Sequence, residues 1–235
     1  MEQVDKLKLA AAESAVAQVK DGMILGLGTG STAAPAVKIL GERVREGLHV
    51  VGIPTSERTA AQARALGIPL SSLDEYPQID MTIDGADVVD TGNLNLIKGR
   101  GGALLREKIV ASATRRLVIV VDSSKLASPL AVSESIPVEV VPFGWQTTAR
   151  RLTDLGARPV LRLDPGGKPF MSDGGHYILD CPFASSATPE SLARELDHVV
   201  GVVEHGLFIG LTSEVHVASV DGVRVLRSQP APQAG

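Results

Sequence analysis

The chain has 235 residues, of which 44% are apolar, enough for a packed core in one large domain or two small ones. Its 27 acidic and 23 basic residues form no long run of either sign, and only 3% of residues are aromatic, so neither a basic surface nor stacking platforms for nucleic acid are expected. The single Cys181 excludes an internal disulfide, and the sequence contains no leader pattern and no apolar stretch of membrane-spanning length. We therefore expect a cytoplasmic protein with no membrane partner.

The first half of the chain alternates helical and strand patterns. Apolar residues at helical spacing over 3–20 predict a helix, and the apolar segment 23–28 predicts a buried strand. After a glycine turn and a second helix, strand patterns recur at 49–53, 79–87 and 117–122, with helical patterns between them. Strands rich in Val and Ile that alternate with helices indicate a parallel sheet covered on both faces.

The pattern changes near Pro129. From there to residue 205, the signals follow in the order strand, helix, strand, strand, helix, strand, which is the split β-α-β order of ferredoxin-like folds. The turn-rich segment 164–175 is the expected hairpin loop between the two middle strands. Three further strand patterns follow, at 206–210, 215–220 and 222–227. We expect these last strands to return to the first sheet.

Two domains account for this order most simply. The larger α/β domain is expected to comprise residues 1–130 and 206–228, and the smaller α+β domain residues 131–205. The polar, proline-containing residues 229–235 are expected to form a disordered tail.

The first glycine turn, GLGTGST at 26–32, lies between a buried strand and a helix. Its glycines let the backbone approach a ligand, and the free N–H groups at the helix start favour an anion such as phosphate. Thr29, Ser31 and Thr32 add hydroxyl donors, although one of them could instead cap the helix.

A nucleotide or adenosyl-methionine site would also use such a turn. It would normally place an acidic residue at the end of the next strand to hold a ribose. Here that strand ends in Pro54-Thr55-Ser56, and the nearest carboxylate, Glu57, is already in the following helix, which counts against a nucleotide.

Two acids and a lysine follow the third strand pattern. Asp84 and Asp87 flank a glycine turn in the crevice where open parallel sheets bind ligands, although Asp84 could simply cap local N–H groups. Lys98 lies between strand and glycines, where it can approach a ligand oxygen, although a solvated loop lysine fits the pattern as well. Lys125 follows a further strand at the same expected edge of the sheet.

Glu107 lies within a helical pattern, ALLREKIVASA at 103–113. On a helix it shares a face with Ala103 and Leu104, and partial removal from water would raise its pKa toward that of a general base active near neutrality. A solvent-facing glutamate is the alternative. The five histidines show no metal-ligand spacing, so neither a metal nor another cofactor is expected.

Taken together, GLGTGST, IDGAD, KGRGGALLREKIVAS, VDSSK, PVEVVPF and VVEHGLF resemble the type A ribose-5-phosphate isomerases in order and spacing. The resemblance runs from about Lys6 to Leu226. It implies a Rossmann-like parallel-sheet domain carrying an inserted, smaller ferredoxin-like domain, and a homodimer or homotetramer. It also implies interconversion of D-ribose 5-phosphate and D-ribulose 5-phosphate through a cis-enediol(ate), in the non-oxidative branch of the pentose phosphate pathway, without a metal.

The resemblance also implies roles for residues of this chain. Glu107 matches the proton acceptor of the family, and Lys98, Asp84 and Asp87 match the other catalytic positions. The matching substrate-binding positions are Thr29, Gly30, Ser31, Thr32, Gly85, Ala86, Gly99, Arg100, Gly101 and Lys125, with Lys8 as a basic position for the phosphate.

Two positions depart from the family pattern. Arg100 replaces a glycine of the usual KGGG, and its side chain could point out of the site or into it. Val88 replaces a glutamate of the usual DGADE, which removes one carboxylate behind the two acids.

Three other functions fit parts of the sequence. A sugar-phosphate sensor would need only the glycine turn at 26–32, where phosphate is expected to bind. A nucleotide- or adenosyl-methionine-dependent enzyme is supported by GLGTG alone. An isomerase or deaminase of another phosphosugar would change only the substrate.

Overall fold

The computed structural model describes residues 2–131, 134–184 and 187–228, so the expected tail at 229–235 lies outside the described residues. The helices are α1 Glu2–Val16, α2 Ala33–Arg45, α3 Glu57–Ala65, α4 Leu104–Ser112, α5 Trp145–Asp154 and α6 Pro189–Asp197. None of these described helices is long and apolar enough to cross a membrane.

The largest sheet has six strands in the order β14-β13-β6-β3-β1-β2. Its strands are β1 Ile24–Leu27, β2 Val51–Pro54, β3 Met81–Gly85, β6 Leu117–Asp122, β13 Glu214–Ser219 and β14 Gly222–Arg227. Neighbouring strands are parallel, except that β14 pairs antiparallel with β13. The parallel α/β sheet predicted from the alternating pattern is therefore confirmed, and β13 and β14 return to it as expected.

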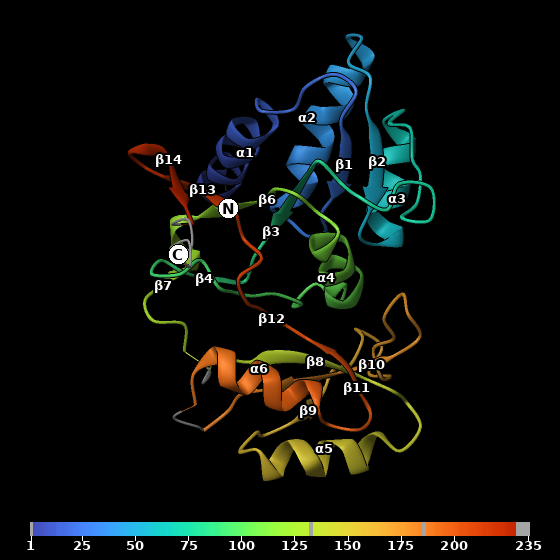
Figure 1. Cartoon of the computed structure of the whole chain (residues 1–235), viewed down its shortest axis with the longest axis vertical. Helices are drawn as coiled ribbons and strands as arrows, with labels where there is room; N and C mark the ends of the chain where they lie inside the picture. The colour runs from blue at the N-terminus through green and yellow to red at the C-terminus, as the bar shows by residue number, and fades with distance from the viewer. Residues whose placement is uncertain (1, 132–133, 185–186, 229–235) are drawn as a thin grey trace, which may run out of the picture.

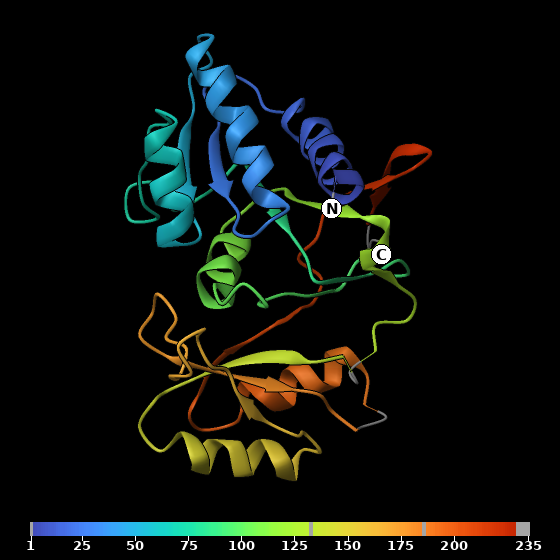
Figure 2. The ribbon, with the colours of Figure 1, turned by 180° about the vertical axis from the view of Figure 1, so that it is seen from behind.

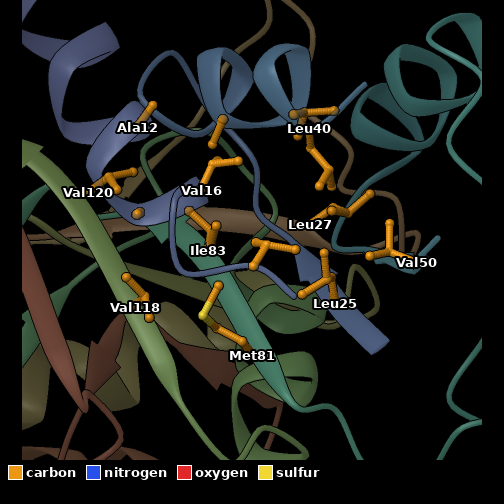
Figure 3. Packing of buried hydrophobic residues seen from close by; sticks show 14 of the residues in the cluster. Ala12, Val16, Leu25, Leu27, Leu40, Val50, Met81, Ile83, Val118 and Val120 are labelled. Atoms are coloured by element: carbon orange, nitrogen blue, oxygen red, sulfur yellow. The ribbon is translucent and has the colours of Figure 1, made fainter. Parts of the chain in front are cut away.

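Both faces of this sheet are buried, as strand β6 illustrates. Val118 and Val120 point toward α1 and α2 and pack with Met81 and Ile83 of β3 (Figure 3). Ile119, on the opposite face of β6, packs in a second apolar cluster that includes residues of α4 and of a smaller sheet. Because side chains alternate along a strand, a run of apolar residues can line two cores at once.

A small sheet lies against that second face, in the order β12-β5-β4-β7. Its strands are β4 Val88–Asp90, β5 Leu96–Ile97, β7 Leu126–Ala127 and β12 Leu207–Phe208. The expectation that segment 206–210 returns to the large sheet is therefore wrong.

The reason for this pairing is a close backbone approach. Leu207 pairs with Ile97, and the N–H of Lys98 donates to the carbonyl of Gly206 at 2.8 Å. A Cβ on residue 206 would lie 2.2 Å from the carbonyl oxygen of Lys98, so only glycine allows the two segments to meet. The pairing holds the chain beside Lys98.

A third sheet has the order β11-β8-β10-β9, with every neighbouring pair antiparallel. Its strands are β8 Ile136–Val140, β9 Val160–Leu161, β10 Tyr177–Cys181 and β11 Val202–His205. This is the ferredoxin-like arrangement predicted from the order of elements, and α5 and α6 pack on one face of the sheet. The exact domain limits, 1–130 with 206–228 and 131–205, stay a prediction.

The third sheet and its two helices lie at the end of the molecule opposite α1, α2 and α3 (Figure 1). The reverse view shows the same separation, with α4 between the two parts (Figure 2). Helix α4 therefore lies between the elements that carry the large sheet and those that carry the third sheet (Figure 1 and Figure 2).

Shortening Ile119 tests the role of β6 as the shared wall of two cores. Ile119 is fully buried, so Ile119→Ala should lower the free energy of unfolding by about 2–5 kcal/mol in a denaturant titration. Ile109→Ala removes the same atoms from a side chain that is 47% exposed and should change it by less than about 0.5 kcal/mol. Equal losses in the two variants would contradict the proposed packing.

Candidate active site

A pocket of about 270 Å³ opens at the carboxyl ends of the parallel strands. It lies beside β1 and β3. The chain passes from β1 to β2 on one side and then crosses to β3 on the other side of β1, and in open α/β sheets such a reversal leaves a crevice between the two central strands. Its lining is Thr29, Gly30, Ser31, Thr32, Arg58, Gly85, Ala86, Asp87, Lys98, Gly99, Arg100, Gly101, Glu107 and Lys125. The structure thus brings together all predicted site residues except Asp84 and Lys8, which lie behind the lining.

The turn between β1 and α2 forms one wall of the pocket. A Cβ on Gly28 would lie 2.5 Å from the Cα of Asp84, so the close passage of β1 and β3 requires glycine there. The N–H of Thr29 donates to Asp84 Oδ1 at 3.0 Å, and Gly30 takes a positive φ of 111°. The N–H of Ala34 in the first turn of α2 donates to the carbonyl of Gly30 at 3.0 Å, and the N–H groups of the turn before it, at Gly30, Ser31 and Thr32, make no hydrogen bond within the described part of the chain. Free N–H groups at a helix start favour an anion.

The hydroxyl groups of this turn have separate roles. Thr32 occupies the N-cap position of α2 but makes no side-chain capping hydrogen bond. Thr29 Oγ1 lies within hydrogen-bond distance of three hydroxyls near the start of α3, those of Thr55 at 2.8 Å, Ser56 at 2.7 Å and Thr59 at 3.0 Å. The Thr29 hydroxyl therefore holds the turn against α3. The Ser31 hydroxyl accepts from Lys8 Nζ but, like that of Thr32, donates to no group in the described part of the chain.

Arg58 also lines the pocket, although the sequence did not identify it. Ser56 caps α3 by accepting from the N–H of Thr59 at 3.1 Å, which places Arg58 in the first turn of that helix. A signal for it existed, since the segment Pro54-Thr55-Ser56 ends a parallel strand at the same edge of the sheet.

Three charged side chains meet at the floor of the pocket. Lys98 Nζ lies 3.0 Å from Asp84 Oδ2 and 3.4 Å from Glu107 Oε1, and it also donates to the carbonyl oxygen of Gly85. The exposed fractions are 1% for Asp84, 3% for Lys98 and 5% for Glu107. The alternatives of a solvated lysine and a surface glutamate are thereby excluded.

Burial controls how these groups ionise. It raises the pKa of Glu107 to about 8, against the opposing Lys98 ammonium and with the Asp84 carboxylate adding to the rise. Burial also raises the pKa of Asp84, but Lys98 and the N–H groups of Gly85 and Thr29 oppose that shift. Lys98 and two main-chain N–H groups thus stabilise the Asp84 carboxylate, whereas the pKa of Glu107 lies about one unit above neutrality.

Lys98 stays charged in this environment. Burial alone would lower its pKa, but the carboxylates of Asp84 and Glu107 outweigh burial and raise that pKa above its ordinary value. The site therefore holds a fixed cation beside a carboxyl that can gain or lose a proton.

The loop after β5 forms the opposite wall of the pocket. The N–H of Arg100 donates to Asp87 Oδ2 at 2.9 Å, which ties the loop to the turn after β3. The guanidinium of Arg100 pairs with Glu134 at 3.2 Å on the surface. Val88, at the other departure from the family pattern, is buried in an apolar cluster with Ile97.

Lys8 and Lys125 are two further cations near the pocket and the glycine turn at 26–32. Lys8 Nζ donates to Ser31 Oγ at 3.0 Å from α1, and Lys125 lines the pocket from the short 3₁₀ helix Ser123–Lys125. Both therefore add positive charge around the start of α2.

Away from the pocket, Asp197, Glu204 and His205 place three possible metal-ligand atoms within 4.8 Å of one another. The Lys108 ammonium already lies among them, 2.6 Å from Glu204 Oε1. Burial and this ammonium lower the pKa of His205 to about 4, so the imidazole is neutral.

The fold and the pocket define a class of protein. An anion-binding helix start faces a buried lysine and a carboxyl that titrates near neutrality, the combination required by an enzyme that moves a proton on an anionic small molecule.

The family model for ribose 5-phosphate isomerase A (phosphoriboisomerase A) matches residues 51–222. A ribose-5-phosphate isomerase A of Gloeobacter violaceus is 58% identical over 97% of this chain and 99% of the relative, and one of Synechococcus sp. is 53% identical over the same shares. The chain belongs to the ribose 5-phosphate isomerase A family.

Solved structures agree with this assignment. Ribose 5-phosphate isomerase A of Methanocaldococcus jannaschii is 42% identical, with a TM-score of 0.90 over 95% of this chain and 99% of that one. A D-ribose-5-phosphate isomerase in complex with phospho-erythronic acid is 38% identical, with a TM-score of 0.91 over the same shares.

The two hydroxyls Thr29 and Ser31 give a matched test of the phosphate turn. Thr29→Val removes one of the hydrogen-bond partners of each of three buried hydroxyls, which keep their other partners, and should lower the free energy of unfolding by about 1–1.5 kcal/mol. Ser31→Ala, at an exposed position, should leave stability within about 0.5 kcal/mol and weaken binding of inorganic phosphate. Calorimetry and thermal unfolding measure both effects, and a stable Thr29→Val protein would contradict the inward role of that hydroxyl.

Proposed function

We propose that this pocket is the active site at which the chain interconverts D-ribose 5-phosphate and D-ribulose 5-phosphate, with Glu107 moving the proton. The isomerase activity, and with it a place in the pentose phosphate pathway, follows from membership of the family. The roles of the individual residues are the proposal. The observation that carries it is the burial of Glu107 beside Lys98, 3.4 Å away, in the wall of an anion-binding pocket.

The reaction needs one base on one face of the substrate. In the open-chain aldose, Glu107 removes the proton from C2. A C1–C2 double bond forms, and the C1 oxygen takes the negative charge of a cis-enediolate. The proton of the C2 hydroxyl passes to the C1 oxygen, and the same carboxyl then returns its proton to C1 as the C2 oxygen becomes a carbonyl, so the carboxylate is regenerated. A pKa of about 8 suits both steps, because the group accepts and releases the proton with little imbalance near neutral pH.

Charge that develops on the substrate oxygens requires fixed donors. Lys98 is a buried cation held by Asp84. The loop 98–101 lines the same pocket, and within the described part of the chain the N–H groups of Gly99 and Gly101 make no hydrogen bond. Preorganised donors in a site that excludes water stabilise such charge more than donors in water. Asp84 and Asp87 would hold substrate hydroxyls or assist ring opening.

The phosphate would bind at the start of α2. Main-chain N–H groups at Gly30, Ser31 and Thr32, with Lys8 and Lys125 nearby, offer the charge and hydrogen bonds that phosphate needs. Binding there is remote from C1 and C2, so its energy can orient the reacting carbons. We expect phospho-erythronic acid to bind in the same way, because it carries a phosphate and a carboxylate at opposite ends.

Further properties belong to the same proposal. The chain would act in the cytoplasm as a homodimer or homotetramer, without a metal or other cofactor and without nucleic acid or membrane partners. The balanced charge of the chain and the use of a lysine and main-chain donors support this proposal.

Replacing the base tests the proposal directly. In EDTA-treated protein, Glu107→Gln should lower ketose formation from ribose 5-phosphate by at least about 10³-fold while phospho-erythronic acid still binds. Glu195→Gln makes the same change on the exposed face of α6 and should leave turnover unchanged. Full activity in Glu107→Gln would remove the base assignment, and an inactive parent that binds phosphosugar would instead indicate a sensor.

The pH dependence of kcat/KM provides a second test. The carboxylate form of Glu107 is the active base and its pKa is raised to about 8, so kcat/KM should rise as pH rises, about tenfold per unit below that value. No descending limb should appear below pH 10, because the pKa of Lys98 is raised above its ordinary value of 10.5. The second pKa of the substrate phosphate is about 6, so its titration is separated from the rise in kcat/KM that is assigned to Glu107. A flat profile between pH 6.5 and about 8.5 would contradict a buried, raised Glu107.

A further inference from the structure

The loop that carries Lys98 is gripped from the ferredoxin-like part of the chain. Arg162 follows β9 and donates through Nη1 to the carbonyl oxygen of Gly99 at 2.9 Å and to that of Arg100 at 3.1 Å. Its side chain is only 14% exposed. These contacts cross from one sheet to the wall of the active-site pocket, which Gly99 and Arg100 line.

Arg162 is itself held in one orientation. Its Nε donates to Asp180 Oδ2 at 2.9 Å and its Nη2 to Asp180 Oδ1 at 2.5 Å, a paired contact from β10. The planar guanidinium fork fits a carboxylate in only one way, so this pairing fixes the direction of Nη1. The ring of Phe170 lies 6.0 Å from the guanidinium and also packs against Gly102, at the far end of the same loop.

Because each peptide is planar, fixing its carbonyl also fixes the direction of its N–H group. The described peptides of this loop are trans, so the N–H of each points opposite to the carbonyl that Arg162 holds. In the first peptide the N–H of Arg100 accordingly reaches Asp87 Oδ2 at 2.9 Å, on the side away from Arg162. In the second peptide the N–H of Gly101 points to that same side and makes no hydrogen bond within the described part of the chain.

The loop would be mobile without such a hold. Gly99 takes a positive φ of 108° and Gly102 one of 80°, and glycine backbones lose more conformational freedom on ordering than any other residue. A donor acts on developing charge only when it is already aimed before the reaction. A rigid anchor on the carbonyl side is therefore what this loop needs.

We propose that Arg162, oriented by Asp180, is a positioning residue that fixes the Gly99 and Arg100 carbonyls and thereby aims the Gly101 N–H at the enediolate oxygen. This role rests on the proposed function of the pocket. The ferredoxin-like part of the chain thus takes part in catalysis through one arginine, although none of its described residues lines the pocket.

Kinetics of Arg162→Met separate positioning from folding. We expect kcat to fall about 10- to 100-fold with KM changed less than about threefold, because the loss falls on transition-state charge rather than on the phosphate. Inhibition by phospho-erythronic acid, whose carboxylate stands in for the enediolate, should weaken along with kcat. Binding of inorganic phosphate should not change. Arg162→Lys should recover part of kcat, since a lysine can still donate to one carbonyl.

Two further variants keep the test decisive. Arg151→Met removes an arginine that donates to the Val200 carbonyl at 2.9 Å in the same part of the chain, and it should leave kcat unchanged. Asp180→Asn leaves Arg162 in place without its partner and should lower kcat in the same direction but less. If Arg162→Met does not fold, Asp180→Asn and Arg162→Lys decide the question.

Two results would overturn the proposal. The first is an unchanged kcat in folded Arg162→Met, and the second is an equal loss of kcat, phosphate binding and thermal stability, which would mark Arg162 as structural. Failure of the proposed function is distinguishable, since the parent would then not convert ribose 5-phosphate. The difference in affinity for phospho-erythronic acid between the parent and Arg162→Met would still show whether Arg162 fixes the direction of the Gly101 N–H.

Discussion

The buried contact of Lys98 with Asp84 and Glu107 is the constraint on which the rest of the structure depends. Removing charged groups from water is costly, and the cost is offset only when each group has partners in good geometry. Asp84 obtains them from Lys98 and from two main-chain N–H groups. Among the described residues the Glu107 carboxyl has only Lys98 as a partner, at the longer distance of 3.4 Å, and burial raises its pKa to about 8.

The architecture explains how these three side chains meet. Asp84 is the penultimate residue of β3 in the large sheet, Lys98 follows β5 of the small sheet, and Glu107 lies in the first turn of α4. The small sheet therefore helps to position Lys98. Its pairing of β5 with β12 brings Gly206 against the main chain of Lys98, and any side chain at that glycine would separate them.

Much of this arrangement could be predicted from the sequence. Long Val- and Ile-rich runs such as 117–122 predict buried strands, and the order of elements in 136–205 predicts the ferredoxin-like sheet. The small sheet could not be predicted, because two-residue strands such as Leu96–Ile97 have no periodicity.

The candidate site divides in the same way. Motif order identified every residue in the lining of the pocket except Arg58, but not the orientations of the side chains, which depend on contacts between distant segments. The inward turn of the Thr29 hydroxyl depends on partners some 26 to 30 residues away, and the grip of Arg162 on the loop spans about 60 residues. Helical spacing suggested that Glu107 faces apolar neighbours, but the depth of its burial depends on Lys98 and Asp84, which arrive from two other elements.

The most direct test of the central claim is the titration of the Glu107 carboxyl itself. In protein labelled with ¹³C at glutamate side-chain carboxyls, the account predicts one resonance that titrates near pH 8 and is missing from Glu107→Gln. Lys98→Met should move that resonance to still higher pH, because the ammonium opposes the rise in the pKa of Glu107. Assignment of Glu107 to a resonance that titrates near 4.5, the ordinary glutamate value, would contradict the account.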